Sequence, residues 1–399
     1  MVINKIMTRA DGRQSMWTKQ CLTLALLLSL GLSAFEAVSA KGKTSRQATA
    51  KITDGQFTYA FTGDIMFGRF YGRHLSRHDR GSDGRPKEPY PLTLMRPLLE
   101  NSAYTLVNLE NPIITDVPKD LKWLTRRFTI RLAGEPKDVM TLKNLGVDFV
   151  SLANNHVYDA NEEGLEETIK HLDAAGLEYA GATLGTDPYQ PIRSKKTPVE
   201  TYVFSGATFV NRVQYFTKSK VAIARTHRLV SRFIKMIKRL RQKKPAALII
   251  VGLHWGPENK ISLRPDQTIN ARRLVDAGAD IVVGHHPHVL HPVEVYRGGV
   301  IFYSLGNFFF DQVHELQRHG MVAQVKWHMD GQLKRPKLAS IQLHGILRPR
   351  DLGAIQRATK RNRVRILGRV KHQSETRHKT KFSWVSTSGV LEWAAGHIN

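Results

Sequence analysis

Apolar runs that end in polar residues recur along this chain, and segments with helical apolar spacing lie between them. The runs are rich in Val, Ile, Leu and aromatic residues, as buried strands are. The expected strands cover residues 57–61, 104–110, 148–152, 245–256 and 281–286. The expected helices cover residues 135–145, 162–176, 225–244 and 266–280. This alternation predicts an α/β fold in which helices cover a sheet.

Later apolar runs follow one another without a helix between them. They cover residues 293–296, 299–305 and 321–327. Strands joined by short loops pair in antiparallel fashion. The second half is therefore expected to add antiparallel strands, and the sequence contains no internal repeat.

The first forty residues have the pattern of a secretory signal. Four basic residues precede an apolar stretch at 22–35, and small residues at 38–40 suit a cleavage site. The stretch is short for a membrane span of about 20 residues, although an uncleaved amino-terminal anchor is the alternative. We therefore expect a signal at 1–40, a linker at 41–56, and export to the periplasm or the outer face of the cytoplasmic membrane.

The strong positive charge of the chain indicates which class of partner it binds. The chain carries a formal net charge of +26, and residues 332–381 hold 15 Lys and Arg against two acids. Such a field favours an anionic partner. An exported chain seldom meets nucleic acid, so we expect a polyanion of the cell envelope and no nucleic acid. A solvated basic tail without a partner is the alternative.

The one cysteine, Cys21, lies at the edge of the signal, so the mature chain has no cysteine nucleophile or zinc-cysteine site.

The polar residues of chemical interest all lie at or just beyond the end of an expected strand. They are Asp64, Asn108, Glu110, Asn154, Asn155, His156, His254 and the histidines at 285, 286, 288 and 291. In open α/β sheets, ligands bind at the carboxyl ends of the strands. Carboxylate, amide oxygen and imidazole without thiolate suit one or two divalent ions of Mn, Fe or Zn.

His286 and His288 stand one residue apart, on the same side of an extended backbone if the strand continues, and Pro287 favours extension before it. Taken singly, each motif could also have a structural role that does not involve a metal. Asp64 could belong to a turn, Glu110 to a cap, the Asn-Asn-His segment to a bonded loop, and His254 to a core. Their shared position at strand ends favours a metal site.

Six segments, in this order, resemble the CapA family of capsule, or poly-γ-glutamate, synthesis proteins. That family is similar to the calcineurin-like metallophosphoesterases. The segments are "FTGDIMFGR", "VNLENPI", "SLANNHVYDANEEGLEETIKHLDAAGL", "GLHWGPE", "GHHPHVLHPVEVY" and "IFYSLGNFFFDQ". The resemblance implies a four-layer α-β-β-α sandwich over residues 57–330, with the basic segment 331–399 completing or flanking it.

The resemblance also implies a role for each matching residue. Asp64 and His288 would bind one metal and Asn155, His254 and His286 a second, with Glu110 between them. His156 would contact substrate phosphate or protonate the leaving group, with Asn155 beside it as a further catalytic residue. The residues expected to contact substrate or support the ligands are Arg69, Asn108, Asn154, His285, His291 and Asn307.

Two departures from the metallophosphoesterase pattern stand out. Met66 occupies the position of a first-strand histidine ligand, and Val157 follows His156 where an orienting acid is common; Asp159 is a possible substitute. The resemblance implies a metal-dependent hydrolase of an anionic polymer or its phosphorylated lipid carrier, working with envelope synthesis machinery. A polymer-binding component of an export machine, without catalysis, is the alternative.

Overall fold

The computed structural model describes residues 55–68, 92–117, 125–126, 129–211, 219–329, 335–350, 355–385 and 389–395. The expected signal, nearly all of the linker, and Arg69 lie outside these residues. No helix among the described residues has both the length and the apolar character of a membrane span.

The larger sheet joins the first strand of the domain to the last. Its main path runs β19-β20-β17-β16-β1-β2-β5-β6, with β15 beside β1 and β18 beside β17. β1, β2, β5 and β6 are parallel, whereas β16, β17, β20 and β19 pair in antiparallel fashion. The strands are β1 Gln56–Ile65, β2 Tyr104–Leu109, β5 Phe149–Ser151, β6 Glu178–Ala180, β15 Asn307–Phe309, β16 His319–His328, β17 Lys337–Leu347, β18 Gln356–Arg357, β19 Ser383–Val385 and β20 Val390–Ala394.

The second sheet has the order β13-β14-β12-β11-β9-β8. Its strands β9, β11, β12 and β14 are parallel, and the edge strands β8 and β13 are antiparallel to their neighbours. The strands are β8 Ile192–Arg193, β9 Thr201–Ala207, β11 Leu248–His254, β12 Ile281–His285, β13 Val293–Tyr296 and β14 Gly299–Phe302. Two small pairs complete the strands, β7 Ala182–Leu184 with β10 Ser219–Val221, and β3 Thr125–Arg126 with β4 Thr129–Ile130.

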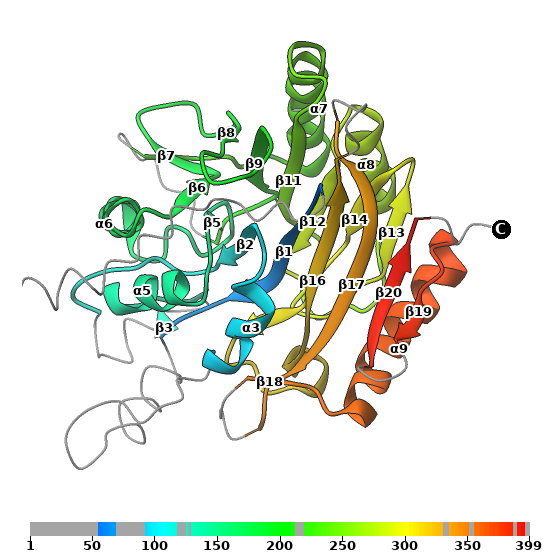
Figure 1. The fold of residues 1–399 in the computed structure, drawn as a ribbon. Coiled ribbons are helices and arrows are strands. Elements are labelled where there is room, and N and C mark those ends of the chain that lie inside the picture. The colour runs from blue at the N-terminus through cyan, green and yellow to red at the C-terminus, as the bar shows by residue number, and fades with distance from the viewer. Residues whose placement is uncertain are drawn as a thin grey trace, which may run out of the picture. The chain divides into compact units, whose positions relative to one another are not determined.

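The two sheets pack face to face, and helices cover their outer faces (Figure 1). The inner faces share one apolar core, in which the ring centroids of Phe61 and Phe302 are 6.0 Å apart. α3, α5 and α6 cover the larger sheet, and α7 and α8 cover the second. The helices are η1 Thr93–Met95, α3 Arg96–Leu99, α5 Pro136–Asn144, α6 Asn161–Ala175, α7 Thr226–Lys243, α8 Pro265–Asp276, η2 Glu315–Arg318 and α9 Lys360–His378. The four-layer α-β-β-α sandwich expected from the sequence is confirmed.

Local sequence explains where the helices begin and end. α5 begins with Pro136 in its first turn, and the Asp138 carboxylate accepts a hydrogen bond of 2.8 Å from the backbone N–H of Glu135. Such a reciprocal cap satisfies amides that have no partner within the helix. α6 ends at Gly176, whose φ of 67° is left-handed, a conformation that favours glycine.

The basic carboxyl-terminal segment is built into the sandwich. Its strands β17 and β20 extend the larger sheet, and α9 lies along the side of both sheets (Figure 1). Ser374 and Thr380 use their hydroxyl oxygens to accept hydrogen bonds from the N–H groups of Val293 and Val295, at 2.9 and 3.0 Å. These bonds satisfy amides on the free edge of β13.

We predict that α9 contributes to the stability of the whole domain. Leu367→Ala should lower the free energy of unfolding by about 2–5 kcal/mol, because Leu367 is fully buried in the core between the sheets. Val364→Ala is the matched control on the same helix, since Val364 is 48% exposed, and should change it by about 0.5 kcal/mol or less. Urea unfolding measures both, and equal effects would contradict the burial of this face.

Candidate metal centre

The register of the parallel strands brings the polar residues together at one end of the sandwich. Asp64 on β1 stands beside Asn108 on β2 and Asn307 on β15. In the second sheet, His254 on β11 stands beside His285 on β12. β1 approaches the loop at residue 306 so closely that a Cβ at Gly63 would lie 1.9 Å from the Gly306 carbonyl oxygen. A larger residue at position 63 would push β1 away from this loop, so glycine is needed to keep the neighbouring Asp64 at the site.

Asp64 is fully buried and is held by three groups. Its Oδ1 accepts a hydrogen bond of 2.8 Å from the Asn108 amide, and its Oδ2 accepts one of 3.2 Å from the His286 backbone N–H. Nδ1 of His288 lies 3.3 Å from Oδ2. Burial opposes ionisation, but the hydrogen bond from His288 and the nearby imidazoles hold the pKa of Asp64 below its usual value. The carboxylate is therefore charged.

Glu110 is the central residue of the site. It is fully buried, and neither of its carboxylate oxygens has a hydrogen-bond partner among the described residues. Its Oε1 lies 3.6 Å from Nε2 of His254 and 3.6 Å from Nε2 of His288. Burial raises the pKa of Glu110 well above its usual value. A carboxylate in such surroundings is costly unless a cation compensates it, so this residue points to a metal ion.

His254 and Asn155 form one side of the site. Nε2 of His254 lies 2.8 Å from Oδ1 of Asn155, and both residues are buried. Burial and the neighbouring His286 lower the pKa of His254 well below its usual value. The ring is therefore neutral, which is the form that binds metals.

The segment that carries His286 and His288 is a turn, and the expectation of an extended backbone there is wrong. β12 ends at His285, and φ is +95° at His286 and +56° at His288. Such left-handed angles are costly for residues with a Cβ and occur where the surroundings enforce them, often at functional sites. The turn, and not strand alternation, directs both imidazoles into the site.

His286 offers a free nitrogen. Its Nδ1 is buried without a hydrogen-bond partner among the described residues. Its ring meets the edge of Phe209 at a centroid distance of 4.6 Å and lies 4.7 Å from the His254 ring. Burial and the neighbouring His288 lower the pKa of His286 to about 3, so the ring is neutral.

Asn307 orients His288. Oδ1 of Asn307 accepts a hydrogen bond of 2.8 Å from Nδ1 of His288, while its amide group donates to the Gln312 side chain and to the Gln317 carbonyl, each at 2.9 Å. With the Nδ1 proton directed to Asn307, loss of the other ring proton would leave the lone pair of Nε2 facing Glu110. Burial opposes a charge on His288, but Glu110 and Asp64 raise its pKa to about 10. Without a metal, His288 is therefore protonated and a proton occupies part of the site.

His156 lies at the rim, where it is 8% exposed, and Asp159 fixes its ring. Oδ2 of Asp159 accepts a hydrogen bond of 2.7 Å from Nδ1 of His156 and another of 2.7 Å from the Leu132 N–H. Asp159 therefore supplies the orienting acid that Val157 does not. Asn154 accepts a bond from the His156 N–H and donates one to the Leu109 carbonyl, which ties this loop to β2.

Met66 provides no polar ligand. Its side chain is fully buried with Leu132 and Phe310 in a small apolar cluster. The Phe310 ring in turn contacts the His288 ring at a centroid distance of 4.6 Å. Apolar side chains thus occupy the position at which the metallophosphoesterase pattern has a histidine ligand.

The donor atoms fit a divalent ion. One nitrogen or oxygen from each of Glu110, His286 and His288 lies within 4.8 Å of the others, and the same holds for Asp64, Glu110 and His254. Glu110 belongs to both groups, as its expected position between two metals requires. The groups pair His286 with His288 and His254 with Asp64, which differs from the pairing that the resemblance implies. Hard oxygen and borderline nitrogen donors suit Mn, Fe or Zn.

His285 and His291 each bond to a backbone carbonyl through Nε2. Nε2 of His285 donates a hydrogen bond of 3.1 Å to the Thr62 carbonyl, which links β12 to β1 across the sandwich. Nε2 of His291 bonds to the Lys260 carbonyl at 2.8 Å and so holds the loop after β11. Both residues are buried with Nε2 bonded to a backbone carbonyl, so they are placed to support the site.

Sequence reasoning missed three residues at the rim. Asn211 lies after β9 and donates a hydrogen bond of 3.3 Å to Nε2 of His156, and Phe209 contacts His286. Glu258 lies four residues after His254, and its Oε1 is 4.0 Å from Nε2 of His288, with 47% of its side chain exposed. All three follow strand ends, so the rule that identified Asp64 could have found them.

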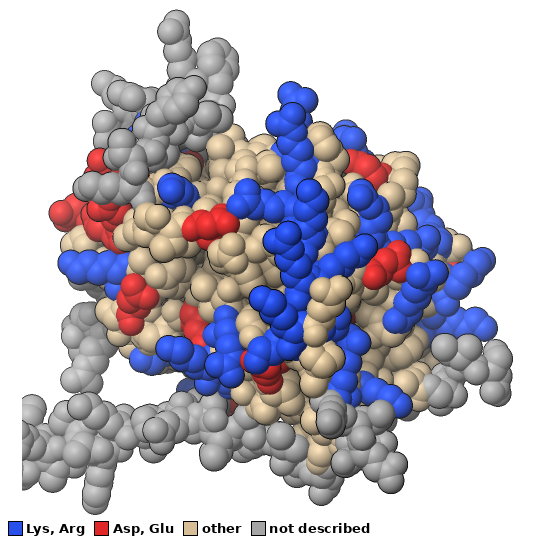
Figure 2. Space-filling model, turned by 90° about the horizontal axis from the view of Figure 1, so that it is seen from above, with Lys and Arg blue, Asp and Glu red and all other residues tan. Residues whose placement is uncertain are grey.

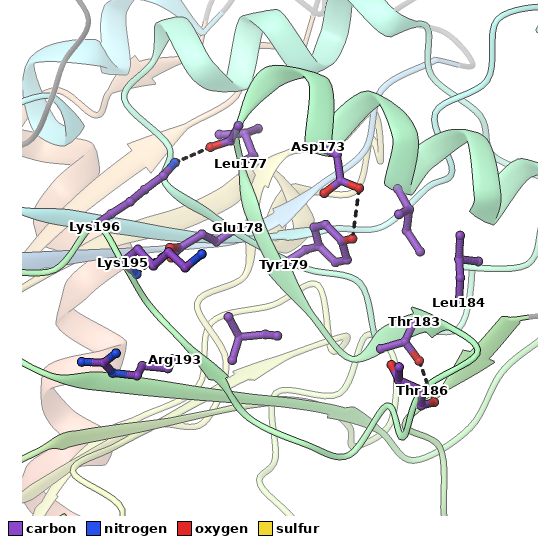
Figure 3. A pocket seen from close by; sticks show the side chains of 13 residues that line it. Asp173, Leu177, Glu178, Tyr179, Thr183, Leu184, Thr186, Arg193, Lys195 and Lys196 are labelled. Carbon is purple, nitrogen blue, oxygen red and sulfur yellow. Dashed lines mark hydrogen bonds between the residues drawn. The ribbon is translucent and has the colours of Figure 1, made fainter.

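A cavity of about 670 Å³ lies elsewhere, beside α6, β6, β7 and β8 (Figure 3). None of the expected site residues that the structure describes lines it. Lys196 directs its ammonium group to the Gly176 carbonyl at 2.6 Å, and the Tyr179 hydroxyl donates to Asp173 at 3.5 Å. Glu178 accepts bonds from the Tyr104 hydroxyl and the Lys195 N–H. These polar groups are engaged with one another, so the cavity does not present a second reactive constellation.

We predict that Asn307→Ala weakens Mn²⁺ or Zn²⁺ binding by about 10–100-fold, because His288 loses the acceptor that sets its orientation. Isothermal titration calorimetry measures the affinity. Asn144→Ala is the control, since Asn144 is exposed at the end of α5. Unchanged affinity in the Asn307 variant would show that His288 is not a ligand.

We also predict that metal affinity rises with pH. Below about pH 10 a metal ion must displace the proton on His288, so affinity should rise by about tenfold per pH unit for each proton displaced. Calorimetry at pH 6.5 and 8.0, in buffers of different ionisation enthalpy, gives both the affinity and the number of protons released. Binding that is independent of pH and releases no proton would contradict this protonation state.

Known proteins resemble this chain over most of its length. Residues 58–312 match the family model described as "Bacterial capsule synthesis protein PGA_cap". The chain is 34% identical to "Capsule biosynthesis protein CapA" of Bacillus anthracis over 64% of this chain and 60% of that protein. It is 32% identical to "PGA biosynthesis protein CapA" of Bacillus subtilis (strain 168) over 76% of each chain.

Among solved structures, a 5'-nucleotidase precursor from Thermus thermophilus matches with a TM-score of 0.42 and 14% identity, over 73% of this chain and 54% of that chain. The family model covers more than half of the sequence, and the Bacillus subtilis relative exceeds 30% identity over three quarters of it. The chain therefore belongs to the bacterial capsule synthesis protein family PGA_cap.

Proposed function

We propose that this protein is an exported, divalent-metal-dependent hydrolase that acts at the cell envelope on an anionic polymer of the poly-γ-glutamate type or on its phosphorylated carrier. The observation that carries the proposal is the buried Glu110 carboxylate, which has no hydrogen-bond partner among the described residues and lies 3.6 Å from each of two imidazole nitrogens. A purely structural role would leave this group uncompensated. The names of the relatives connect the family with capsule and PGA biosynthesis.

The ligands would be Asp64, Glu110, His254, His286 and His288, with the Asn155 amide oxygen beside them. A divalent metal bound there supplies Lewis-acid polarisation of an ester or amide oxygen and lowers the pKa of a coordinated water. The contribution of the protein itself is to hold the ligand atoms in fixed positions. The left-handed turn at His286 and His288, with Asn307 behind it, orients two of the imidazoles before any ion arrives.

His156 is suited to proton transfer. Asp159 accepts the hydrogen bond from Nδ1, and Nε2 faces Asn211 at the rim. Because Nε2 accepts the Asn211 hydrogen bond, it carries a lone pair that can take up a proton and then pass that proton to a leaving group. Asn211 would keep the ring aligned, and Phe209 would shield His286 from water on that side.

Charge supports an anionic substrate. The net charge is +26, and Figure 2 shows Lys and Arg in a band across the face seen there. On α7 the exposed basic residues recur at helical spacing. A surface of this kind attracts a polyanion from a distance and concentrates it near the site.

The direct test is hydrolysis of bis-p-nitrophenyl phosphate, p-nitrophenyl phosphate and poly-γ-glutamate by the purified chain loaded with Mn²⁺, Fe²⁺ or Zn²⁺. His156→Ala should lower kcat by about 10²–10⁴-fold with unchanged metal content, because proton transfer is lost and the ligands remain. The His286→Ala variant should lose both activity and bound metal, because it lacks one of the proposed ligands. His227→Ala is the control, since His227 is exposed on α7.

A non-catalytic polymer-binding role is the second candidate, and the apolar cluster around Met66 favours it because one ligand of the metallophosphoesterase pattern is missing. It predicts no hydrolysis of any of these substrates by the metal-loaded wild type. It also predicts polyanion binding that survives chelation and weakens steeply with salt. That pair of results would replace the hydrolase proposal.

A further inference from the structure

Five arginines gather at one end of the larger sheet, in the part of the chain that the metal centre does not use. Arg318 ends η2, Arg348 and Arg350 follow β17, and Arg365 and Arg369 lie one turn apart on α9. All five lie beyond residues 58–312, the part matched by the family model. We call these residues the arginine cluster.

Backbone contacts hold the cluster together. The Arg348 N–H donates a hydrogen bond of 2.9 Å to the Arg318 carbonyl, and the Arg318 guanidinium donates one of 3.2 Å to the Arg348 carbonyl. The Arg348 guanidinium also donates to the carbonyls of Gln312 and Pro349. Arg348 is 3% exposed, so its charge is fixed in position and is not free to swing into solvent.

The cluster is poorly neutralised within the described part of the chain. Arg365 forms an ion pair of 2.6 Å with Glu315, and it is the one member for which these residues supply an ion pair. The buried Nε–H groups of Arg318, Arg348 and Arg369 donate no hydrogen bond to a described residue. Like charges with free donors are unfavourable when brought together, unless an anion joins them.

The charges of the cluster also affect one another. Burial, followed by Arg350 and Arg348, lowers the pKa of the Arg318 guanidinium. Burial, followed by Arg365 and Arg369, lowers the pKa of the neighbouring His319 to about 4. Both shifts have the direction expected where positive charges share a confined space.

A single turn connects the cluster to the metal centre. Arg318 follows Gln317, whose carbonyl accepts the hydrogen bond from Asn307, and Asn307 orients His288. The Gln317 side chain donates to Asn259, next to Glu258 at the rim. A group bound by the arginines would therefore lie beside the residues that support the candidate ligands.

We propose that the arginine cluster is a binding site for a multivalent oxyanion, a compound or chain that carries several carboxylate or phosphate groups. Planar guanidinium groups match the two oxygens of such groups and bind them through paired, charge-assisted hydrogen bonds. The site can receive one anionic group of a chain while another part of the same chain reaches the metal centre. Anion binding itself needs no metal, so it stands apart from the proposed hydrolysis.

The test measures binding of two probes to the full chain in the presence of chelator, namely inorganic tripolyphosphate by calorimetry and a labelled glutamate oligomer by fluorescence anisotropy. Arg350→Gln/Arg365→Gln should weaken binding of at least one probe by about tenfold or more, because two charge-assisted contacts are lost. Both residues are exposed, and an unchanged thermal midpoint verifies folding. The probe that binds more tightly identifies phosphate or carboxylate as the preferred group.

The matched control is Lys143→Gln/Lys170→Gln, which removes the same charge from exposed positions on α5 and α6. It should change the affinity by less than about threefold, since neither helix carries a member of the arginine cluster and only the long-range field changes. Equal weakening in the two double variants would overturn the proposal, because binding would then depend on net charge alone. Failure of the wild type to bind either probe would overturn it as well.

Discussion

The Glu110 carboxylate is the constraint on which the site depends. It is enclosed between the two sheets with no hydrogen-bond donor of its own among the described residues, and imidazoles approach it from the end of β11 and from the turn after β12. Removing a carboxylate from water without compensation is one of the larger costs that a fold can carry. The neighbouring residues reduce this cost only partly, by keeping a proton on His288. The arrangement is a ligand set that stays incomplete until a cation enters.

The sandwich makes this arrangement possible because residues from both sheets reach one point. Asp64 and Glu110 come from the larger sheet, whereas His254, His286 and His288 come from the second. The hydrogen bond from His285 to the Thr62 carbonyl fixes the two sheets relative to each other at the base of the site. Donors on separate layers can therefore keep a constant spacing, although they are far apart in the sequence. This rigidity suits a centre whose ligands must be in place beforehand.

Many of the strands and helices, and the location of the site, could be predicted from the sequence for physical reasons. Strands of high apolar content and helices with a clear amphipathic face have local signals, so β11, β12 and α6 were predicted close to their observed bounds. The carboxyl ends of parallel strands meet at one edge, which located Asp64 and His254. The left-handed turn at His286 had no such signal, because tertiary contacts impose it against the preference of the residue.

The roles of neighbouring residues were harder to separate. His285 and His286 are adjacent and chemically identical in sequence, yet one bonds to a backbone carbonyl behind the site and the other offers a free nitrogen within it. Glu258 and Asn211 each lie four residues beyond a strand end, so the strand-end rule indicates their neighbourhood, but their contacts depend on the course of a loop. Asp159 was named as a substitute for the missing acid at Val157, and the observed bond to His156 gives it that role.

The position of α9 has a consequence for how this protein behaves among other molecules. A strand at the border of a sheet exposes amide groups that readily recruit a foreign strand. Ser374 and Thr380 accept hydrogen bonds from two such amides on β13, and α9 packs against this strand. A shortened chain that stopped at residue 312 would lack this cover and half of the larger sheet. It would be prone to self-association, so the basic segment also protects the domain against aggregation.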